Sequence, residues 1–242
     1  MTASQNRAQA RQNLAGKWKK AVLLTLVSSI ITYVINLILN LLPIGGFIID
    51  SIISIPIFFG ILISFFKIND NEEFDYLDFL GNGMENFGKV WSIILNAFLK
   101  MIVPIILTIA CIILLAWSTY AENELLSLIC LIIYIVLAIW VLIKGLSYAL
   151  SLYIIYDNPE MTGKEAVEKS AELMNGNIWS YICLNLSFIG WAILGIFTFG
   201  IGYLWLAPYI KISHINFYRN LAGTIQTEND DVDQGPISQY NQ

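Results

Sequence analysis

The stretch that decides the fold is residues 21–42, AVLLTLVSSIITYVINLILNLL, which holds 22 residues without one charged side chain. An α-helix rises 1.5 Å per residue, so about 20 apolar residues are needed to cross the hydrocarbon core of a bilayer. A second apolar run, residues 44–66, follows across the tight corner LPIGG at 42–46. The two runs predict a helical hairpin that crosses a membrane twice.

Two further apolar runs predict a second hairpin. Residues 90–117 are too long for one perpendicular crossing and contain Lys100, so we expect the run to begin along the interface and to cross over residues 101–120. Residues 125–143 predict the return crossing. Residues 146–156 either extend that helix or bend away to lie in the interface.

The last apolar block, residues 178–218, is long enough for two more crossings, with a turn between Gly195 and Gly200. The expected fold class is therefore all-α: a polytopic membrane helix bundle with six transmembrane helices arranged as three hairpins. The expected membrane domain is residues 21–218. A basic segment (1–20) precedes it, and a polar, acidic tail (219–242), expected to be disordered, follows it.

The overall composition agrees with a membrane protein. Hydrophobic residues make up 57% of the chain and charged residues only 13%, whereas a soluble domain carries about 25% charged residues. A water-soluble monomer is thereby excluded. The net charge of −5 comes without a basic face, so no nucleic-acid partner is expected.

The distribution of positive charge gives an independent test of the threading, because cytoplasmic loops hold an excess of Lys and Arg. All 13 Lys and Arg fall in the segments that six crossings place on one side of the membrane. They are Arg7, Arg11, Lys17, Lys19, Lys20, Lys67, Lys89, Lys100, Lys144, Lys164, Lys169, Lys211 and Arg219. This asymmetry predicts that both termini are cytoplasmic.

Two acidic stretches on the same side have amphipathic patterns. Residues 71–86 and 162–174 each alternate apolar with charged side chains at helical spacing, which predicts interfacial helices at the cytoplasmic surface. Thr162 and Glu165 have the spacing of a capping box, so the second of these helices has a well-defined start.

A weak internal repeat accompanies the expected inward-to-outward crossings. Gly16, Gly88 and Gly176 are each followed two or three residues later by Trp18, Trp91 or Trp179. In one interpretation each Gly ends a surface helix and each Trp anchors the next helix at the lipid headgroups. The alternative is that interfacial Trp residues occur here simply because such positions favour them.

Polar residues inside expected spans are the candidate functional residues, because such residues are costly in lipid. In the first span they follow one helical face, formed by Thr25, Ser29, Thr32, Asn36 and Asn40. Either this face hydrogen-bonds to neighbouring helices, or it lines a hydrated cavity for a ligand.

Asp50 is the one acidic residue well inside an expected span. It is a candidate to bind a cation or an amine or to relay protons, although it equally fits local capping of nearby serines at the outer headgroups. Asn185, in the fifth span, is expected to hydrogen-bond across helices.

The sequence offers neither a catalytic set nor a metal site. His214 is the sole histidine, and the cysteines Cys111, Cys130 and Cys183 lie singly in apolar runs. Phosphate-binding glycine loops and nucleophile motifs are absent from the sequence as well. We therefore expect a protein that is not an enzyme and needs no cofactor.

Several short motifs, most of them in the last third of the chain, resemble the bacterial multi-pass membrane-protein family called domain of unknown function 975. They are SAELMNG (170–176), LSFIGW (186–191), TFGIG (198–202), PY (208–209) and FY (217–218), together with Arg11, Leu14, Gly16 and Trp18 near the start. The resemblance implies a multi-pass protein of the plasma membrane, mostly of Gram-positive bacteria. It supplies no catalytic residues.

Two functional hypotheses follow from these observations. In the first, the protein acts by binding, as an accessory or scaffold subunit or in self-protection (immunity) against a membrane-active peptide or toxin; its partners are the lipid bilayer and another membrane protein or such a peptide. In the second, it is a small transporter or channel whose lumen is lined by the first span and Asp50.

Overall fold

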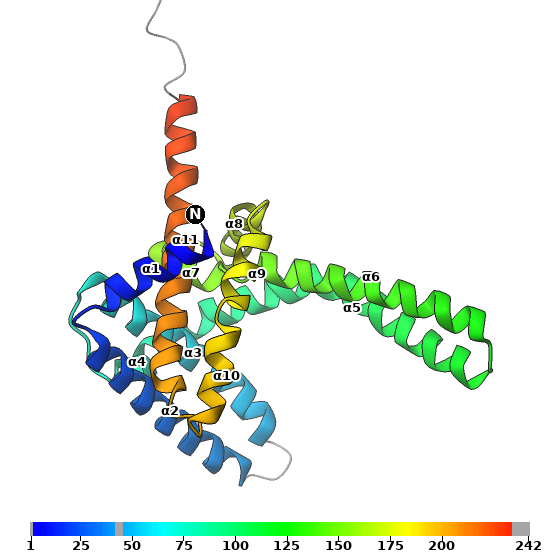
Figure 1. Ribbon diagram of the computed structural model, residues 1–242, viewed down its shortest axis with the longest axis horizontal. Coiled ribbons are helices and arrows are strands. Elements are labelled where there is room, and N and C mark those ends of the chain that lie inside the picture. The colour runs from blue at the N-terminus through cyan, green and yellow to red at the C-terminus, as the bar shows by residue number, and fades with distance from the viewer. Residues whose placement is uncertain (1, 42–45, 234–242) are drawn as a thin grey trace, which may run out of the picture. The chain divides into compact units, whose positions relative to one another are not determined.

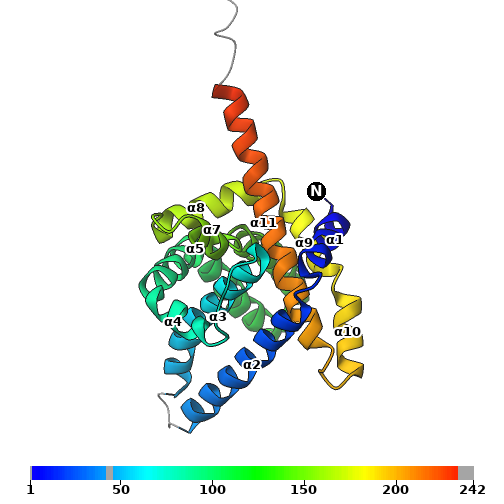
Figure 2. The same cartoon turned by 90° about the vertical axis from the view of Figure 1, so that its left-hand side faces the viewer.

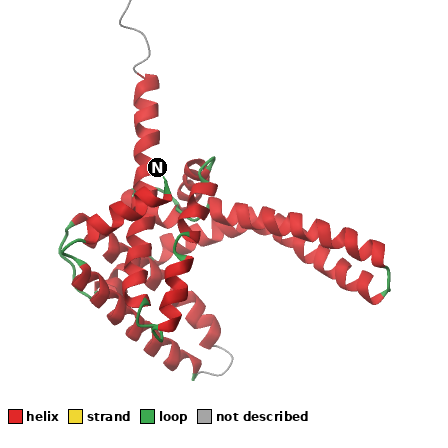
Figure 3. Cartoon of the chain, in the orientation of Figure 1, coloured by secondary structure: helices red, strands yellow, loops and turns green. Residues whose placement is uncertain are grey.

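In the computed structural model, which describes residues 2–41 and 46–233, every regular element is a helix (Figures 1 and 3). The chain divides into two compact units, the first formed by Met1–Val90 and Trp179–Gln242 and the second by Trp91–Ile178. The all-helical class predicted from the sequence is therefore confirmed over the described residues.

The helices of the first unit come from both ends of the chain. They are α1 (Ala3–Leu14), α2 (Trp18–Asn40), α3 (Gly46–Asp70), α4 (Asp78–Glu85), α9 (Ile178–Leu186), α10 (Ile189–Phe197) and α11 (Tyr203–Asp233). The second unit holds most of α5 (Phe87–Tyr120), then α6 (Glu124–Ser147), α7 (Ser151–Asp157) and α8 (Gly163–Met174).

Among the described residues, five helical segments are long and apolar enough to span a membrane. They are Trp18–Asn40, Ile49–Asp70, Phe87–Tyr120, Glu124–Asp157 and Ile178–Phe197. The helix expected to provide a sixth crossing, α11, is not among them, because its second half is polar and charged. Many large apolar side chains of α5 and α6 are exposed, as expected for helices solvated by lipid.

Several details differ from the sequence-based expectations. No break separates residues 90–100 from the expected third crossing, since α5 is continuous from Phe87 to Tyr120 with Pro104 inside it. The expected helix over residues 71–86 is only the eight residues of α4, because residues 72–75 are not helical. The turn expected between Gly195 and Gly200 lies at residues 198–202. Most of the corner at 42–46 lies outside the described residues.

Glycines allow α4 to pack closely on α3 in the first unit. A Cβ at Gly60 would lie 1.9 Å from the carbonyl oxygen of Phe79, and a Cβ at Gly83 would lie 2.4 Å from that of Pro56. The atoms that an added Cβ would meet belong to the backbone of the neighbouring helix, so they cannot rotate away. Only glycine fits at these two positions.

A polar cluster joins α1, α3 and α11 at the end of α3. Asp70 forms a two-pronged ion pair with Arg219 of α11, and one of its two hydrogen bonds measures 2.8 Å. Lys17 Nζ, just before α2, donates to the carbonyl oxygens of Ile68 and Asn69 at 2.9 and 3.1 Å. Burial lowers the pKa of Lys17, and the negative charge of Asp70 partly opposes that shift. The cluster fixes the end of α3 against the middle of α11 and against the start of α2.

In the second unit α8 attaches to its neighbours through one buried serine. Ser170 Oγ donates to the carbonyl oxygen of Ser147 at 2.8 Å and accepts from the backbone N–H of Leu150 at 3.1 Å. These are the groups left open where the chain breaks between α6 and α7. An ion pair of 3.0 Å between Lys100 and Glu168 adds a contact from α8 to α5.

The internal repeat has a clear structural counterpart in two helices. Both α1 and α8 have 12 residues and begin with a capping box, Thr2 with Gln5 and Thr162 with Glu165. Both are followed by a glycine with positive φ, +76° at Gly16 and +75° at Gly176. A glycine with a left-handed backbone therefore follows the end of a helix at these two positions. At Gly88 the interpretation that the glycine ends a helix is wrong, because Gly88 lies in the first turn of α5.

Candidate binding groove

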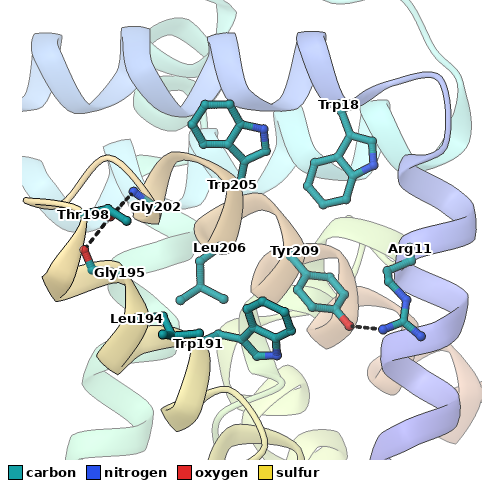
Figure 4. A pocket seen from close by; sticks show the side chains of 10 residues that line it. All are labelled: Arg11, Trp18, Trp191, Leu194, Gly195, Thr198, Gly202, Trp205, Leu206 and Tyr209. Atoms are coloured by element: carbon teal, nitrogen blue, oxygen red, sulfur yellow. Dashed lines mark hydrogen bonds between the residues drawn. The ribbon is translucent and has the colours of Figure 1, made fainter.

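An apolar groove of about 470 Å³ opens on the first unit between α1, α2, α10 and α11 (Figure 4). Its lining is almost entirely hydrocarbon and indole. The residues that form it are Arg11, Trp18, Trp191, Leu194, Gly195, Thr198, Gly202, Trp205, Leu206 and Tyr209. A volume of this size falls within the range of about 300–1,000 Å³ typical of ligand sites.

Two helices supply most of the wall. Trp191 and Leu194 project from α10, and Trp205 and Leu206 from α11, into the same opening (Figure 4). Trp191, Leu194 and Trp205 are each at least half exposed, whereas Leu206 is buried at the base. A ligand can therefore enter the groove from its open side.

The turn between α10 and α11 closes one end of the groove. A Cβ at Gly202 would lie 2.9 Å from Thr198 Oγ1 and 3.2 Å from the Cα of Gly195, so the two helices approach at glycines. Thr198 Oγ1 also donates to the carbonyl oxygen of Gly195 at 2.8 Å and accepts from the N–H of Gly202 at 2.8 Å. The hydroxyl of Thr198 and the N–H of Gly202 are therefore hydrogen-bonded within the turn.

The other end of the groove is cationic. Arg11 Nη1 donates to the hydroxyl of Tyr209 at 3.5 Å, which is a long hydrogen bond (Figure 4). Arg7, one helical turn earlier, donates from Nη1 to the carbonyl oxygen of Ser187 at 3.3 Å, while its Nε is buried without a partner. Among the described residues neither arginine has a carboxylate partner.

Aromatic contacts hold Tyr209 in place at this cationic end. Its ring centroid lies 5.2 Å from that of Phe188 in an edge-on arrangement and 6.5 Å from that of Trp18. Tyr209 is buried, whereas Arg11 is exposed. The guanidinium of Arg11 thus has free hydrogen-bonding capacity beside a rigid aromatic wall.

This arrangement suits an amphiphile. The hydrocarbon walls accept an apolar chain, and the guanidinium at one end accepts a carboxylate or phosphate. The residues that the structure describes hold no group of three or more His, Cys, Asp or Glu placed to bind a metal ion.

The polar residues predicted on the first span bond mainly to their own helix. Thr25 Oγ1 donates to the carbonyl oxygen of Ala21, Asn36 Nδ2 to that of Thr32, and Asn40 Nδ2 to that of Asn36. The hydroxyl of Thr32 is buried without a partner. These hydrogen bonds therefore do not connect this face to a neighbouring helix.

Asp50 and Asn185 also make local contacts. Asp50 Oδ1 accepts a hydrogen bond of 3.1 Å from Ser54 Oγ, one turn later in α3. Asn185 Nδ2 donates to the carbonyl oxygen of Tyr181 at 2.8 Å, in its own helix rather than across helices. Neither residue lines the groove.

His214 is buried in α11, and its ring packs against that of Tyr181 with centroids 5.2 Å apart. Its Nε2 has no hydrogen-bond partner among the described residues. This histidine belongs to the packing between α9 and α11.

The groove residues were not singled out as a site from the sequence. From the sequence, Trp18 was expected to be a headgroup anchor and Arg11 one of the cytoplasmic cations, and both also belong to the motifs of the family resemblance. The signal that was available is the run of Trp191, Trp205 and Tyr209 in a block without charge, close to motifs shared with a family. Their convergence on α1 is a tertiary feature that spacing cannot give.

Comparison with known proteins identifies a family. The sequence pattern of the family described as "Protein of unknown function (DUF975)" matches residues 1–224. No curated protein and no solved structure matches the chain. The matched range covers all of the residues that line the groove.

Proposed function

The chain belongs to the DUF975 family, and from that premise we propose that it is a non-enzymatic membrane protein that acts by binding an anionic amphiphile in the groove. One observation carries the proposal: an apolar, tryptophan-lined groove ends at an arginine that has no carboxylate partner among the described residues. The amphiphile is drawn from the surrounding bilayer, because the groove is open on its apolar side.

The proposed threading places both termini in the cytoplasm of a bacterial plasma membrane. Three hairpins, α2–α3, α5–α6 and α10–α11, each return the chain to the cytoplasmic side, where α4 and α8 lie at the surface. The segregation of all 13 cations supports this threading. Arg11 precedes the first span, so the cationic end of the groove lies at the level of the cytoplasmic headgroups.

The arginine decides selectivity in this proposal. An apolar chain that moves from lipid into an apolar groove exchanges one hydrocarbon environment for another, so little hydrophobic energy is gained. A charge-assisted hydrogen bond to a guanidinium is about twice as strong as a neutral one. We therefore expect the groove to distinguish ligands by their headgroup.

Two cellular roles fit such a site. The protein is either an accessory subunit whose partner is regulated by the bound amphiphile, or a self-protection protein that captures a membrane-active peptide. A gene deletion distinguishes them: changed sensitivity to membrane-active peptides supports self-protection, and changed levels of a partner protein support the accessory role.

The transporter alternative finds less support. A polar lumen needs side chains whose hydrogen bonds are open to water or substrate, whereas Asn36, Asn40 and Asp50 bond within their own helices. The variant Asp50→Asn in proteoliposomes tests this alternative, because loss of flux in a folded protein would favour transport.

The binding proposal is tested with lipid as the probe. Purified protein is placed in phosphatidylcholine nanodiscs that contain a minor fraction of phosphatidylglycerol, and the lipid retained after gentle release is identified by native mass spectrometry. The unaltered protein is expected to retain phosphatidylglycerol in preference to phosphatidylcholine. Arg11→Gln is expected to lose this preference, because the headgroup then has no cation to pair with.

Leu194→Trp tests the apolar part of the site by filling the groove, and it is expected to abolish retention of either lipid. Ile132→Trp is the matched control, because Ile132 is exposed to a similar extent on α6, outside the groove. Equal retention of both lipids by the unaltered protein, or an unchanged preference in Arg11→Gln, would refute the proposal.

A further inference from the structure

We infer that the turn between α10 and α11 is embedded in the lipid hydrocarbon and reaches the water on neither side of the membrane. This inference is independent of ligand binding in the groove. It concerns the third hairpin, which the sequence alone predicts to cross the whole membrane twice.

Helix α9 packs at the level of α1. Arg7 of α1 donates to the carbonyl oxygen of Ser187, at the break between α9 and α10. Tyr181 in α9 packs against Phe217 of α11, with ring centroids 5.3 Å apart. Phe217 lies two residues before Arg219, which pairs with Asp70. These contacts place α9 at the level of α1 and the polar cluster, so α9 adds nothing to the depth that the hairpin reaches.

The part of the third hairpin that follows α9 is short. Phe188 and Trp18 both contact the ring of Tyr209, so α10, α2 and this part of α11 share one level near the start of α2. Phe199 at the turn lies ten residues before Tyr209, so even at the full rise of a helix the turn reaches only about 15 Å beyond that level. A hydrocarbon core is about 30 Å thick, so the turn ends near its middle.

The same rise gives α2 a much longer reach. Its 23 residues extend about 34 Å, enough to cross the core with some tilt. In Figures 1 and 2 the turn between α10 and α11 accordingly stops short of the far end of α2. A hairpin that begins at the same level as α2 and is less than half as long cannot emerge on the outer side.

The side chains of the turn are apolar. Phe197, Phe199 and Ile201 are exposed by 77%, 99% and 61%, and residues 178–210 contain no charged side chain. Three exposed apolar side chains at a tight turn are unfavourable in water and favourable in hydrocarbon.

The backbone of the turn also fits a lipid environment. In hydrocarbon each unpaired backbone group costs several kcal/mol, so irregular backbone is tolerated there only when its polar groups are bonded. Every N–H from Thr198 to Leu206 has an acceptor within this hairpin, including Thr198 Oγ1, which accepts from Gly202. The hydroxyl of Tyr203 donates to the carbonyl oxygen of Ala192 at 2.9 Å.

Cysteine labelling tests the inference. In a background with Cys111, Cys130 and Cys183 replaced by alanine, the variant Phe199→Cys is treated with a membrane-impermeant maleimide in intact cells and in inverted vesicles. We expect the cysteine at position 199 to remain unlabelled in both preparations and to be fully labelled after denaturation. Leu41→Cys is the outer control and Gln12→Cys the cytoplasmic control, since both positions are exposed in the same unit.

Labelling of Phe199→Cys from either side would overturn the inference. A second copy of the protein covering the turn would also block the reagent, so a depth measurement completes the test. A bimane group on Phe199→Cys is expected to be quenched more by lipids with a nitroxide near the middle of the chain than by lipids with a headgroup nitroxide. The absence of that difference would likewise overturn the inference.

Discussion

Two glycines in one short helix give the sharpest test of the packing in the first unit. Gly81 and Gly83 both lie within α4. A Cβ at Gly81 meets nothing within 4 Å, whereas a Cβ at Gly83 would lie 2.4 Å from the carbonyl oxygen of Pro56. Alanine at these positions therefore separates the effect of helix propensity from the effect of close packing.

The magnitudes follow from these distances. An alanine in place of glycine inside a helix stabilises it by about 0.5–1 kcal/mol, so Gly81→Ala should stabilise the fold. Overpacking costs about 1–3 kcal/mol, and a contact with backbone atoms falls at the upper end because no side chain can move aside. Gly83→Ala should therefore be less stable than Gly81→Ala by about 1–3 kcal/mol.

The assay is thermal unfolding of the purified variants in the same detergent, monitored by tryptophan fluorescence. For a chain of this size about 1 kcal/mol corresponds to about 2–4 °C, so Gly83→Ala should unfold about 2–12 °C below Gly81→Ala. Equal unfolding temperatures of the two variants would refute the close approach of α4 to α3.

Three further contacts give testable predictions. Thr162→Ala removes the N-cap of α8 and should lower the free energy of unfolding by about 1 kcal/mol in a chemical denaturation series. The hydrogen bond and the charge of Lys100 lower the pKa of Glu168 below its ordinary value of 4.5. This ion pair therefore stabilises the fold above pH 4.5, and the stabilisation is lost as the pH falls through the lowered pKa of Glu168. The difference in unfolding temperature between the unaltered protein and Glu168→Gln should be present at neutral pH and vanish in acid. Asp70→Asn weakens a half-buried ion pair with Arg219 and should cost about 1–2 kcal/mol, between the values for exposed and buried pairs; a melting curve unchanged from that of the unaltered protein would contradict it.

The sequence predicted the parts of the fold that depend on local properties. Helix length and apolarity are properties of a single segment, so the candidate spans from α2 to α10 could be located without tertiary information. The capping box of Thr162 and Glu165 is likewise local, and the structure has both of its hydrogen bonds. These features need only the period and rise of a helix.

The groove and the helix breaks depend on contacts between distant residues. Ser187, where α9 stops, is neither a proline nor a glycine, so local sequence gave no reason to end a helix there; the break after Ser147 instead lies close to the bend that the sequence left open. Arg11 meets Tyr209 across nearly 200 residues of chain. A span predicted from composition alone, such as residues 178–197, is therefore interrupted by a partner that composition does not reveal.

Each of the two repeated helices donates a hydrogen bond to a carbonyl oxygen at one of these interruptions. The carbonyl oxygens at the end of a helix have no N–H four residues later to bond with, so a donor from elsewhere satisfies them. In the first unit Arg7 of α1 takes the carbonyl of Ser187, and in the second unit Ser170 of α8 takes that of Ser147. Each capped 12-residue helix therefore acts on the backbone of another helix within its own unit. Arg7→Gln removes the donor to the carbonyl of Ser187, so the variant should unfold at a lower temperature than the unaltered protein when unfolding is monitored by tryptophan fluorescence.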